Sequence, residues 1–202
     1  MHPPGRKRWQ SVSGAFALIG LMLLPATAES FRDIQNRRPD LFHKETGLRI
    51  ARQRAPIPDD IPLPAVRVDA KQTADLLEQG AIALDVFGAL QSRYDELDGA
   101  WLVGKERLSL PGAIWLPETG RGTLAADMRT YLETNLERLT KGDKGRPLVV
   151  YCVSDCWMSW NASQHIAGMG YSSINWFALG TDGWLENGGD LAPVDPVPVD
   201  TE

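Results

Sequence analysis

The stretch PLVVYCVSDCWMSW, residues 147–160, contains both cysteines of the chain. Residues 148–151 form a short apolar run after a turn rich in glycine and lysine, which is the pattern of a buried parallel strand. Apolar residues then recur at near-helical spacing over residues 157–166, and glycines at positions 168 and 170 end that pattern. The sequence therefore predicts a strand, a tight loop and a helix, with Cys152 at the strand end where open α/β sheets bind ligands.

This loop indicates sulfur chemistry. We expect the backbone N–H groups of residues 153–157 and the positive end of the helix to face the side chain of Cys152. A helix N-terminus can lower the pKa of a cysteine from about 8.5 to roughly 3.5–7.5. The prediction is therefore that Cys152 is more acidic than Cys156. The alternative is an inert, buried Cys152, with Cys156 packed beside it or joined to it.

The first 28 residues have the pattern of a secretory signal peptide. Basic residues at positions 6–8 precede an apolar run over residues 15–24, and small residues follow up to Ala28. Because the apolar run is shorter than a bilayer span of about 20 residues, we expect cleavage after Ala28, with an uncleaved anchor as the alternative. The protein is then periplasmic, free of the membrane, and in an oxidising compartment where Cys152 and Cys156 could form a disulfide.

The charge of the chain excludes nucleic-acid binding. The formal net charge is −5, and cleavage after Ala28 removes three basic residues and no acidic one. No basic stretch remains that could neutralise phosphates. The remaining length suits one domain with a sizeable core.

The mature sequence divides into a lead-in, one domain and a tail. Residues 29–65 mix charges with prolines, which predicts an extended lead-in over the domain surface, and Phe42, Leu48 and Ile50 indicate that part of it packs against the domain. Residues 66–191 alternate strand-like and helical patterns, and this predicts an α/β domain with a parallel sheet. Residues 192–202 are acidic and contain prolines, which predicts a disordered tail. The expected strands lie within 66–68, 81–86, 111–117, 148–151 and 173–179, and the expected helices within 69–80, 124–139, 157–166 and 183–189.

Five short segments, taken together, resemble a rhodanese-like domain. They are Asp85 at the end of its strand, LPGAI (residues 110–114), LVVYC (148–152), GY (170–171) and GW (183–184). The resemblance covers residues 66–191 and implies a single domain with a central parallel sheet flanked by helices. It also implies that Cys152 is the sulfur-carrying cysteine.

The cysteine loop also resembles a narrower family, the PQQ-dependent catabolism-associated CXXCW motif proteins. Cys152, Cys156 and Trp157 carry this resemblance, although three residues separate the cysteines where that motif has two. The family implies a role beside PQQ- and cytochrome-dependent oxidation of alcohols in the periplasm. No stretch of the sequence is a recognisable PQQ site, so no cofactor is expected.

The loop departs from ordinary rhodaneses in its charge. Trp157 stands where a basic or small residue is usual, Phe87 replaces a frequent arginine, and residues 152–163 contain no cation. An anionic donor would then meet only backbone dipoles and Asp155. Phosphatase activity is excluded, because related phosphatase loops hold the phosphoryl oxygens with an arginine fork.

Three functions are compatible with these residues. A sulfurtransferase would hold sulfur as a persulfide on Cys152 and exchange it with a small thiol or a protein donor or acceptor. A thiol–disulfide module would use Cys152 as the attacking thiolate and Cys156 as its resolving partner. A non-enzymatic protein would bind Cu(I) through the two cysteines and Met158 or His165. Zinc and covalent haem lack suitable ligands here.

The other expected site residues support the loop. Val153, Ser154, Asp155, Trp157 and Met158 are the candidates for binding the substrate. Asp85 is expected to accept N–H bonds from the loop. Trp157 and Trp160, three apart at a helix start, could cover the sulfur or form a docking surface, with one of them in the core.

Overall fold

The computed structural model describes residues 29–89 and 94–200 of the chain. The predicted signal peptide, residues 1–28, lies outside the described residues, as do residues 90–93. Within the part that is described, no helix is long and apolar enough to cross a membrane.

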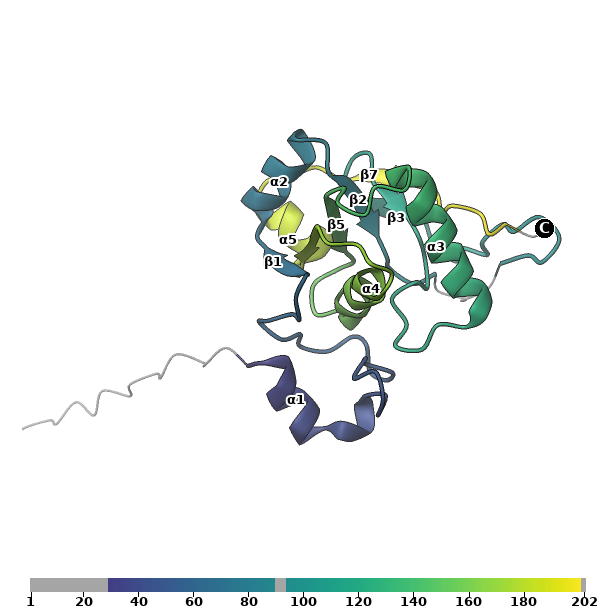
Figure 1. Cartoon of the computed structure of the whole chain (residues 1–202). Coiled ribbons are helices and arrows are strands. Elements are labelled where there is room, and N and C mark those ends of the chain that lie inside the picture. Colours follow the sequence, from purple (N-terminus) through teal and green to yellow (C-terminus); the bar gives the residue numbers. More distant parts are fainter. Residues whose placement is uncertain (1–28, 90–93, 201–202) are drawn as a thin grey trace, which may run out of the picture.

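Five parallel strands form the central sheet, in the order β1-β6-β5-β2-β4 (Figure 1). They are β1 (Val66–Val68), β2 (Ile82–Asp85), β4 (Ile114–Trp115), β5 (Leu148–Tyr151) and β6 (Ile174–Phe177). Every residue of β5 and β6 is buried, because helices cover both faces of the sheet. Asp85 pairs with Tyr151, so the carboxyl ends of β2 and β5 lie together at one edge of the sheet.

The helices pack in two layers, one on each face of the sheet (Figure 1). Alternate strand residues point to opposite faces. Ala83, Val149 and Tyr151 face α2 (Ala70–Glu78) and α5 (Gly180–Glu186). Leu84, Leu148 and Val150 face α3 (Ala126–Thr140) and α4 (Trp157–Gly168). The predicted fold class, a parallel sheet flanked by helices in a single domain, is confirmed.

The predicted helices occur, with some differences at their ends. The side chain of Asp69 caps α2 by accepting a hydrogen bond from the N–H of Gln72. The side chain of Gln72 in turn accepts a hydrogen bond from the N–H of Asp69. The chain after α3 turns through Lys141 and Gly142, both at positive φ, in accordance with the expected stop. The last helix, α5, begins at Gly180 and ends at Glu186, earlier than its expected range of 183–189.

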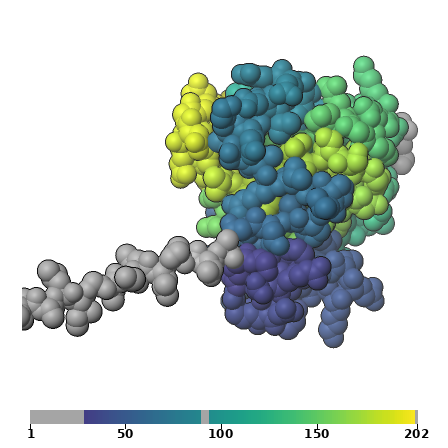
Figure 2. Space-filling view, turned by 60° about the vertical axis from the view of Figure 1, so that its left-hand side comes forward, coloured from purple at the N-terminus to yellow at the C-terminus, as the bar shows by residue number. Residues whose placement is uncertain are grey.

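The lead-in contains helical segments, which corrects the expectation of an extended segment, and it packs against the domain through Phe42 and Leu48, as predicted, whereas Ile50 is exposed. It contains α1 (Phe31–Arg37), capped by Ser30, and a short 3-10 helix (Pro39–Leu41). Ile34, Leu41, Phe42 and Leu48 are buried against three tryptophans of the domain, namely Trp157, Trp160 and Trp176. Figure 2 shows the lead-in packed against the lower side of the domain in purple and blue. Burial of these apolar side chains fixes the segment in place.

The tail is also ordered as far as residue 200, contrary to the prediction of disorder. Strand β7 (Ala192–Val194) pairs antiparallel with β3 (Arg107–Ser109), a strand that the sequence did not indicate within residues 87–110. The N–H of Val197 donates to the carbonyl of Trp115 at 3.0 Å, and that of Val199 to Gly99 at 2.9 Å. Backbone pairing with other loops therefore holds a segment whose composition alone favours disorder.

Candidate active site at the cysteine loop

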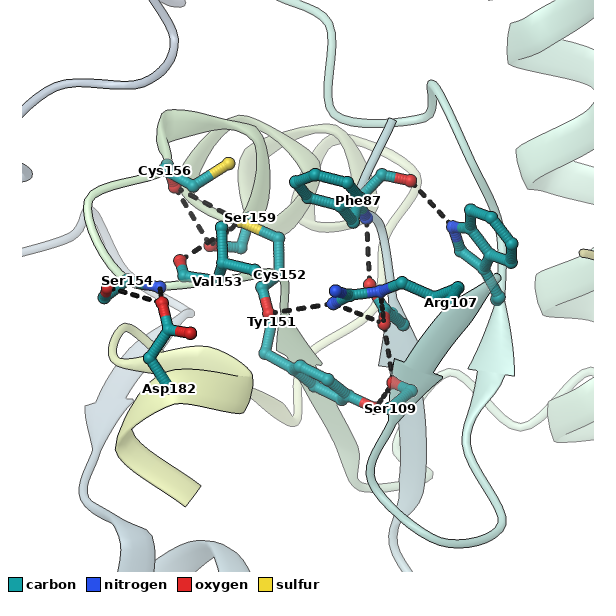
Figure 3. A network of polar contacts seen from close by, with 12 residues as sticks. Phe87, Arg107, Ser109, Tyr151, Cys152, Val153, Ser154, Cys156, Ser159 and Asp182 are labelled. Carbon is teal, nitrogen blue, oxygen red and sulfur yellow. Dashed lines mark hydrogen bonds and ion pairs between the residues drawn. The ribbon is translucent and has the colours of Figure 1, made fainter. Parts of the chain in front are cut away.

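The cysteine loop connects β5 to α4. Cys152 follows β5 directly, and Cys156 is the N-cap residue of α4. Between them, Asp155 adopts a left-handed conformation with φ of 49°, which turns the loop back on itself. Both cysteines are free thiols, and Figure 3 shows them within one network of polar contacts.

Cys152 is completely buried. Its Sγ atom lies 3.5 Å from the carbonyl oxygens of Val153 and Cys156 and 3.6 Å from the hydroxyl of Ser159. Burial raises the pKa of Cys152 well above its ordinary value, because a thiolate is poorly solvated there. The neighbouring Cys156 raises it further.

Cys156 is also buried, with 1% of its surface exposed, but its pKa shifts in the opposite direction. A hydrogen bond from Cys152 lowers the pKa of the Cys156 thiol, and the N–H groups of Met158 and Val153 and the charge of Arg54 lower it further, against the effect of burial. The prediction that Cys152 is the more acidic cysteine is therefore wrong. The strand end sends the Cys152 side chain into the protein, whereas the N-cap position places Cys156 at the positive end of α4.

The expected ring of N–H groups around Cys152 is also incomplete. The N–H and hydroxyl of Ser154 both donate to Asp182 of α5, at 2.9 and 2.6 Å. The N–H of Trp157 donates to the carbonyl of Gln53 in the lead-in at 2.8 Å. These contacts hold the loop to its neighbours, and the N–H groups that still lower the pKa of a cysteine are those of residues 153 and 158 for Cys156 and of residue 159 for Cys152.

Of the two cysteines, Cys156 lines a cleft of about 950 Å³. Arg52, Arg54 and Arg121 line the same cleft, together with Asp182 as the acidic residue among the described lining residues. Residues 152–163 contain no cation, as the sequence shows, but the fold brings arginines from two distant segments to the loop. The expectation that an anion would meet only backbone dipoles and Asp155 is corrected. Asp155 itself is exposed.

The lead-in forms one wall of this cleft. Arg54 and Cys156 pair as an isolated antiparallel bridge, with the N–H of Ala55 donating to the carbonyl of Asp155 at 2.9 Å. Arg121 donates to the side-chain oxygen of Gln53 at 2.7 Å and forms an ion pair with Glu118. No local pattern in the sequence marks Arg54 or Arg121 as site residues, because the fold alone brings them to the loop.

A buried ion pair supports the loop from below (Figure 3). Asp85 accepts hydrogen bonds from the N–H of Phe87 at 2.9 Å, from Arg107 at 2.8 Å and from Ser109 at 2.5 Å. Burial raises the pKa of Asp85, and these three donors and the charge of Arg107 oppose that rise. Arg107 also donates to the carbonyl of Cys152 at 3.3 Å, so Asp85 reaches the loop through Arg107 rather than through loop N–H groups.

The N-terminus of α5 closes the loop from behind. The N–H of Thr181 donates to the carbonyl of Cys152 at 3.1 Å. A Cβ atom at Gly180 would lie 2.5 Å from that carbonyl oxygen, so this close approach requires glycine. Neither Asp182 nor Arg107 was expected from the sequence as a support of the loop.

The tryptophans lie away from the cleft. Trp157 and Trp160 are both buried under the lead-in, and their indole N–H groups donate to the carbonyls of Pro56 and Asp60 at 3.0 and 3.1 Å. The lead-in therefore occupies the face that could have been a docking surface. Met158, which is also buried, lines the cleft with Cys156.

The described residues contain no cluster of three or more histidine, cysteine, aspartate or glutamate side chains that could hold a metal ion. His165, a candidate copper ligand, has its Nε2 atom 2.8 Å from the carbonyl of Arg121. The two cysteines and Met158 remain together at the loop.

No family model matches this sequence, and no curated protein matches it either. Among solved structures, it is similar to a thiosulfate sulfurtransferase from Pseudomonas aeruginosa, with 21% identity and a TM-score of 0.44 over 63% of this chain and 20% of that one. The rhodanese-like domain of an Anabaena sp. protein has 20% identity and a TM-score of 0.40, over 66% of this chain and 86% of that chain. The human single-domain sulfurtransferase TSTD1 has 20% identity and a TM-score of 0.39, over 62% and 97% of the two chains.

The second of these neighbours is described as a rhodanese-like domain, and the other two as sulfurtransferases. This chain spans about a fifth of the length of the first of them. The likeness concerns the fold, and identities this low carry over no activity.

Proposed function

We propose that this protein is a sulfurtransferase that carries sulfane sulfur on its cysteine loop. The observation that carries the proposal is the setting of Cys156, at the start of α4 in a cleft lined by three arginines. A thiolate there attacks the sulfane sulfur of a donor, the bond between that sulfur and the rest of the donor breaks, and the donor leaves with the electron pair, as sulfite from thiosulfate or as a thiolate from a persulfide. Cys156 keeps the sulfur as a persulfide. Cys152, the carrier expected from the sequence, is enclosed and supports Cys156 from behind.

The cleft favours a small anionic donor. Arg52, Arg54 and Arg121 lie along it, and guanidinium groups suit the oxygens of sulfonates and carboxylates. A donor with its anionic end on these arginines places its sulfane sulfur toward Cys156. The acceptor is a small thiol or a protein thiol that enters the same cleft.

The test is sulfur uptake by the reduced protein without oxygen, followed by intact mass. Thiosulfate and glutathione persulfide serve as donors, and Cys152→Ser and Cys156→Ser as matched variants. We expect Cys152→Ser to gain one sulfur atom and Cys156→Ser to gain none. Uptake by Cys156→Ser alone would move the carrier back to Cys152, and no uptake by either variant or the wild type would overturn the proposal.

A second candidate is thiol–disulfide exchange, because the two free thiols occupy one loop and the Cys152 thiol hydrogen bonds to Cys156. In that case Cys156 attacks a disulfide partner and Cys152 releases it. The variant Cys152→Ser would then trap the partner as a mixed disulfide. Retention of sulfur without trapping favours sulfur transfer.

We also propose that the protein works in the periplasm, beside PQQ- and cytochrome-dependent oxidation of alcohols. The sequence of residues 1–28 and the CXXCW-like spacing support this setting. N-terminal sequencing of protein from its native host tests the location. A mature N-terminus at Glu29 is expected, and Met1 or His2 would contradict export.

A further inference from the structure

We propose that Cys152 reduces the persulfide on Cys156, so that the loop releases the sulfur as hydrogen sulfide and closes a Cys152–Cys156 disulfide. This inference rests on the proposed function, because it begins from a persulfide on Cys156. It adds a second activity to the site, a reductive release of sulfur that uses the two cysteines as electron donors.

The position of Cys152 suits an internal thiol. Both cysteines are buried, at 0% and 1% exposed, but Cys156 lines the cleft and Cys152 does not, so a donor in the cleft meets Cys156 first. The sulfur of Cys152 nevertheless lies 3.5 Å from the carbonyl oxygen of Cys156, because the left-handed turn at Asp155 folds the loop back. The sulfur of Cys152 is thus held within the same turn as Cys156, close enough for the two side chains to influence each other's pKa, and it is shielded from bulky acceptors.

Hydrogen bonds to neighbouring segments hold the loop in place around Cys152 and Cys156. Asp182 holds Ser154 through two hydrogen bonds, and the lead-in pairs with Cys156 through Arg54. Arg107 and Thr181 fix the carbonyl of Cys152. The backbones of Cys152 and Cys156 are therefore held in a defined arrangement before any sulfur arrives, which favours an intramolecular step.

The hydroxyl of Ser159 accepts a hydrogen bond from the thiol of Cys152 at 3.6 Å. The same hydroxyl donates a hydrogen bond to the carbonyl of Cys156 at 3.3 Å. The indole N–H of Trp176 donates to the same hydroxyl at 3.0 Å and fixes it. Ser159 thereby orients the Cys152 thiol, and its own N–H supports the thiolate when the proton leaves. The raised pKa of Cys152 keeps the thiol protonated until that point.

The reaction balances within the loop. The sulfur of Cys152 attacks the Sγ atom of the Cys156 persulfide, which forms the Cys152–Cys156 bond and breaks the bond between Sγ and the terminal sulfur. The electron pair of the broken bond leaves on the terminal sulfur, and the proton of Cys152 joins it as hydrogen sulfide. The sulfane sulfur is reduced, and the two cysteine sulfurs are oxidised to the disulfide. An external dithiol must then reduce the disulfide before another cycle.

The experiment is a single turnover of reduced protein with one equivalent of glutathione persulfide, without oxygen and without any further thiol. Hydrogen sulfide and the intact mass of the protein are followed together. The wild type is expected to release one equivalent of sulfide and to lose two hydrogen atoms from its mass. Cys152→Ser is expected to keep the added sulfur and to release no sulfide, and Cys152→Ala serves as a second variant if serine is not tolerated there.

Ser159→Ala tests the orienting role. We expect the step from protein-bound sulfur to free sulfide, followed separately from sulfur uptake, to be slower than in the wild type, because the Cys152 thiol loses the hydroxyl that orients it. A dithiol such as dithiothreitol should restore repeated sulfide release by the wild type. If the wild type keeps the added sulfur and releases no sulfide, the internal reduction is overturned while the sulfurtransferase proposal stands. If neither Cys152 variant nor the wild type takes up sulfur, the proposed function fails first.

Discussion

Arg54 of the lead-in and Cys156 of the cysteine loop lie side by side as an antiparallel bridge. The bridge joins two segments that are far apart in the sequence. Next to it, the carbonyl of Gln53 accepts a hydrogen bond from the N–H of Trp157 at the start of α4. The lead-in therefore completes the site: it supplies one wall of the cleft and two of its three arginines.

Loss of Asn161 is expected to loosen the lead-in. Its side-chain oxygen accepts the N–H of Arg49 at 3.0 Å, and its amide donates to the carbonyls of Arg49 and Gly120 at 2.9 and 3.0 Å. Because Asn161 is buried, Asn161→Ala leaves these groups without partners and should cost about 1–3 kcal/mol of the free energy of unfolding. Urea unfolding measures this. The exposed Asn187→Ala is the control, and an equal loss there would contradict the assignment.

Removal of Arg107 should be strongly destabilising. Arg107 pairs with the fully buried Asp85, and the side chain of Arg107 is itself only 11% exposed. Arg107→Met leaves a buried carboxylate without its cation, which typically costs about 3–5 kcal/mol. The double variant Asp85→Asn with Arg107→Met should recover part of this loss in the same unfolding measurement. A double variant less stable than Arg107→Met would show that the charge of Asp85 is not the cause.

The amphipathic helix α3 provides a test of the core. Leu132 is fully buried between α3 and the sheet, as its spacing in the sequence predicts. Leu132→Ala should lower the free energy of unfolding by about 2–5 kcal/mol. Leu102, which is 54% exposed, is the matched control, and its replacement by alanine should stay within about 0.5 kcal/mol. Similar midpoints for both variants would mean that this face of α3 is not part of the core.

Local patterns in the sequence predicted the sheet, its helices and the loop with both cysteines. Burial gives β5 a continuous apolar run and gives α4 apolar residues at near-helical spacing, and both patterns can be recognised in the sequence. Local patterns did not predict the ordered tail, since β7 is held by backbone pairing with β3 rather than by its composition. Local patterns also did not predict which cysteine side chain lines the cleft. Spacing places Cys152 at the end of a strand, but neighbours from α5 and the lead-in decide which sulfur meets the cleft.

His165 predicts a dependence of stability on pH. Burial lowers the pKa of His165, with Arg129 adding to the effect and the carbonyl of Arg121 opposing it. A histidine whose pKa is lower in the folded state adds stability above its unfolded pKa of about 6.5, and this stability is lost as the pH falls toward the folded pKa. Subtracting the urea stability of His165→Gln from that of the wild type across this range isolates the effect. A difference that does not change with pH would contradict it.

The last prediction concerns which cysteine reacts. Cys156 has a lowered pKa and lines the cleft, whereas Cys152 is buried with a raised pKa. Alkylation by iodoacetamide, followed against pH by intact mass, should therefore show Cys156 in the Cys152→Ser variant reacting at lower pH than Cys152 in the Cys156→Ser variant. Serine at position 152 keeps a hydrogen-bond donor beside Cys156, so this background preserves the main cause of the shift.

Arg54 provides the second half of that test. In the Cys152→Ser background, Arg54→Ala should move the alkylation midpoint of Cys156 to higher pH, because the positive charge that favours the thiolate is gone. Arg54→Lys should restore most of the shift, since it keeps the charge. Arg146→Ala, which removes an exposed arginine that donates to the carbonyl of Gly80, controls for net charge and should leave the midpoint in place. An unchanged midpoint in Arg54→Ala would remove Arg54 from the site, and a lower midpoint for Cys152 than for Cys156 would reinstate Cys152 as the attacking thiolate.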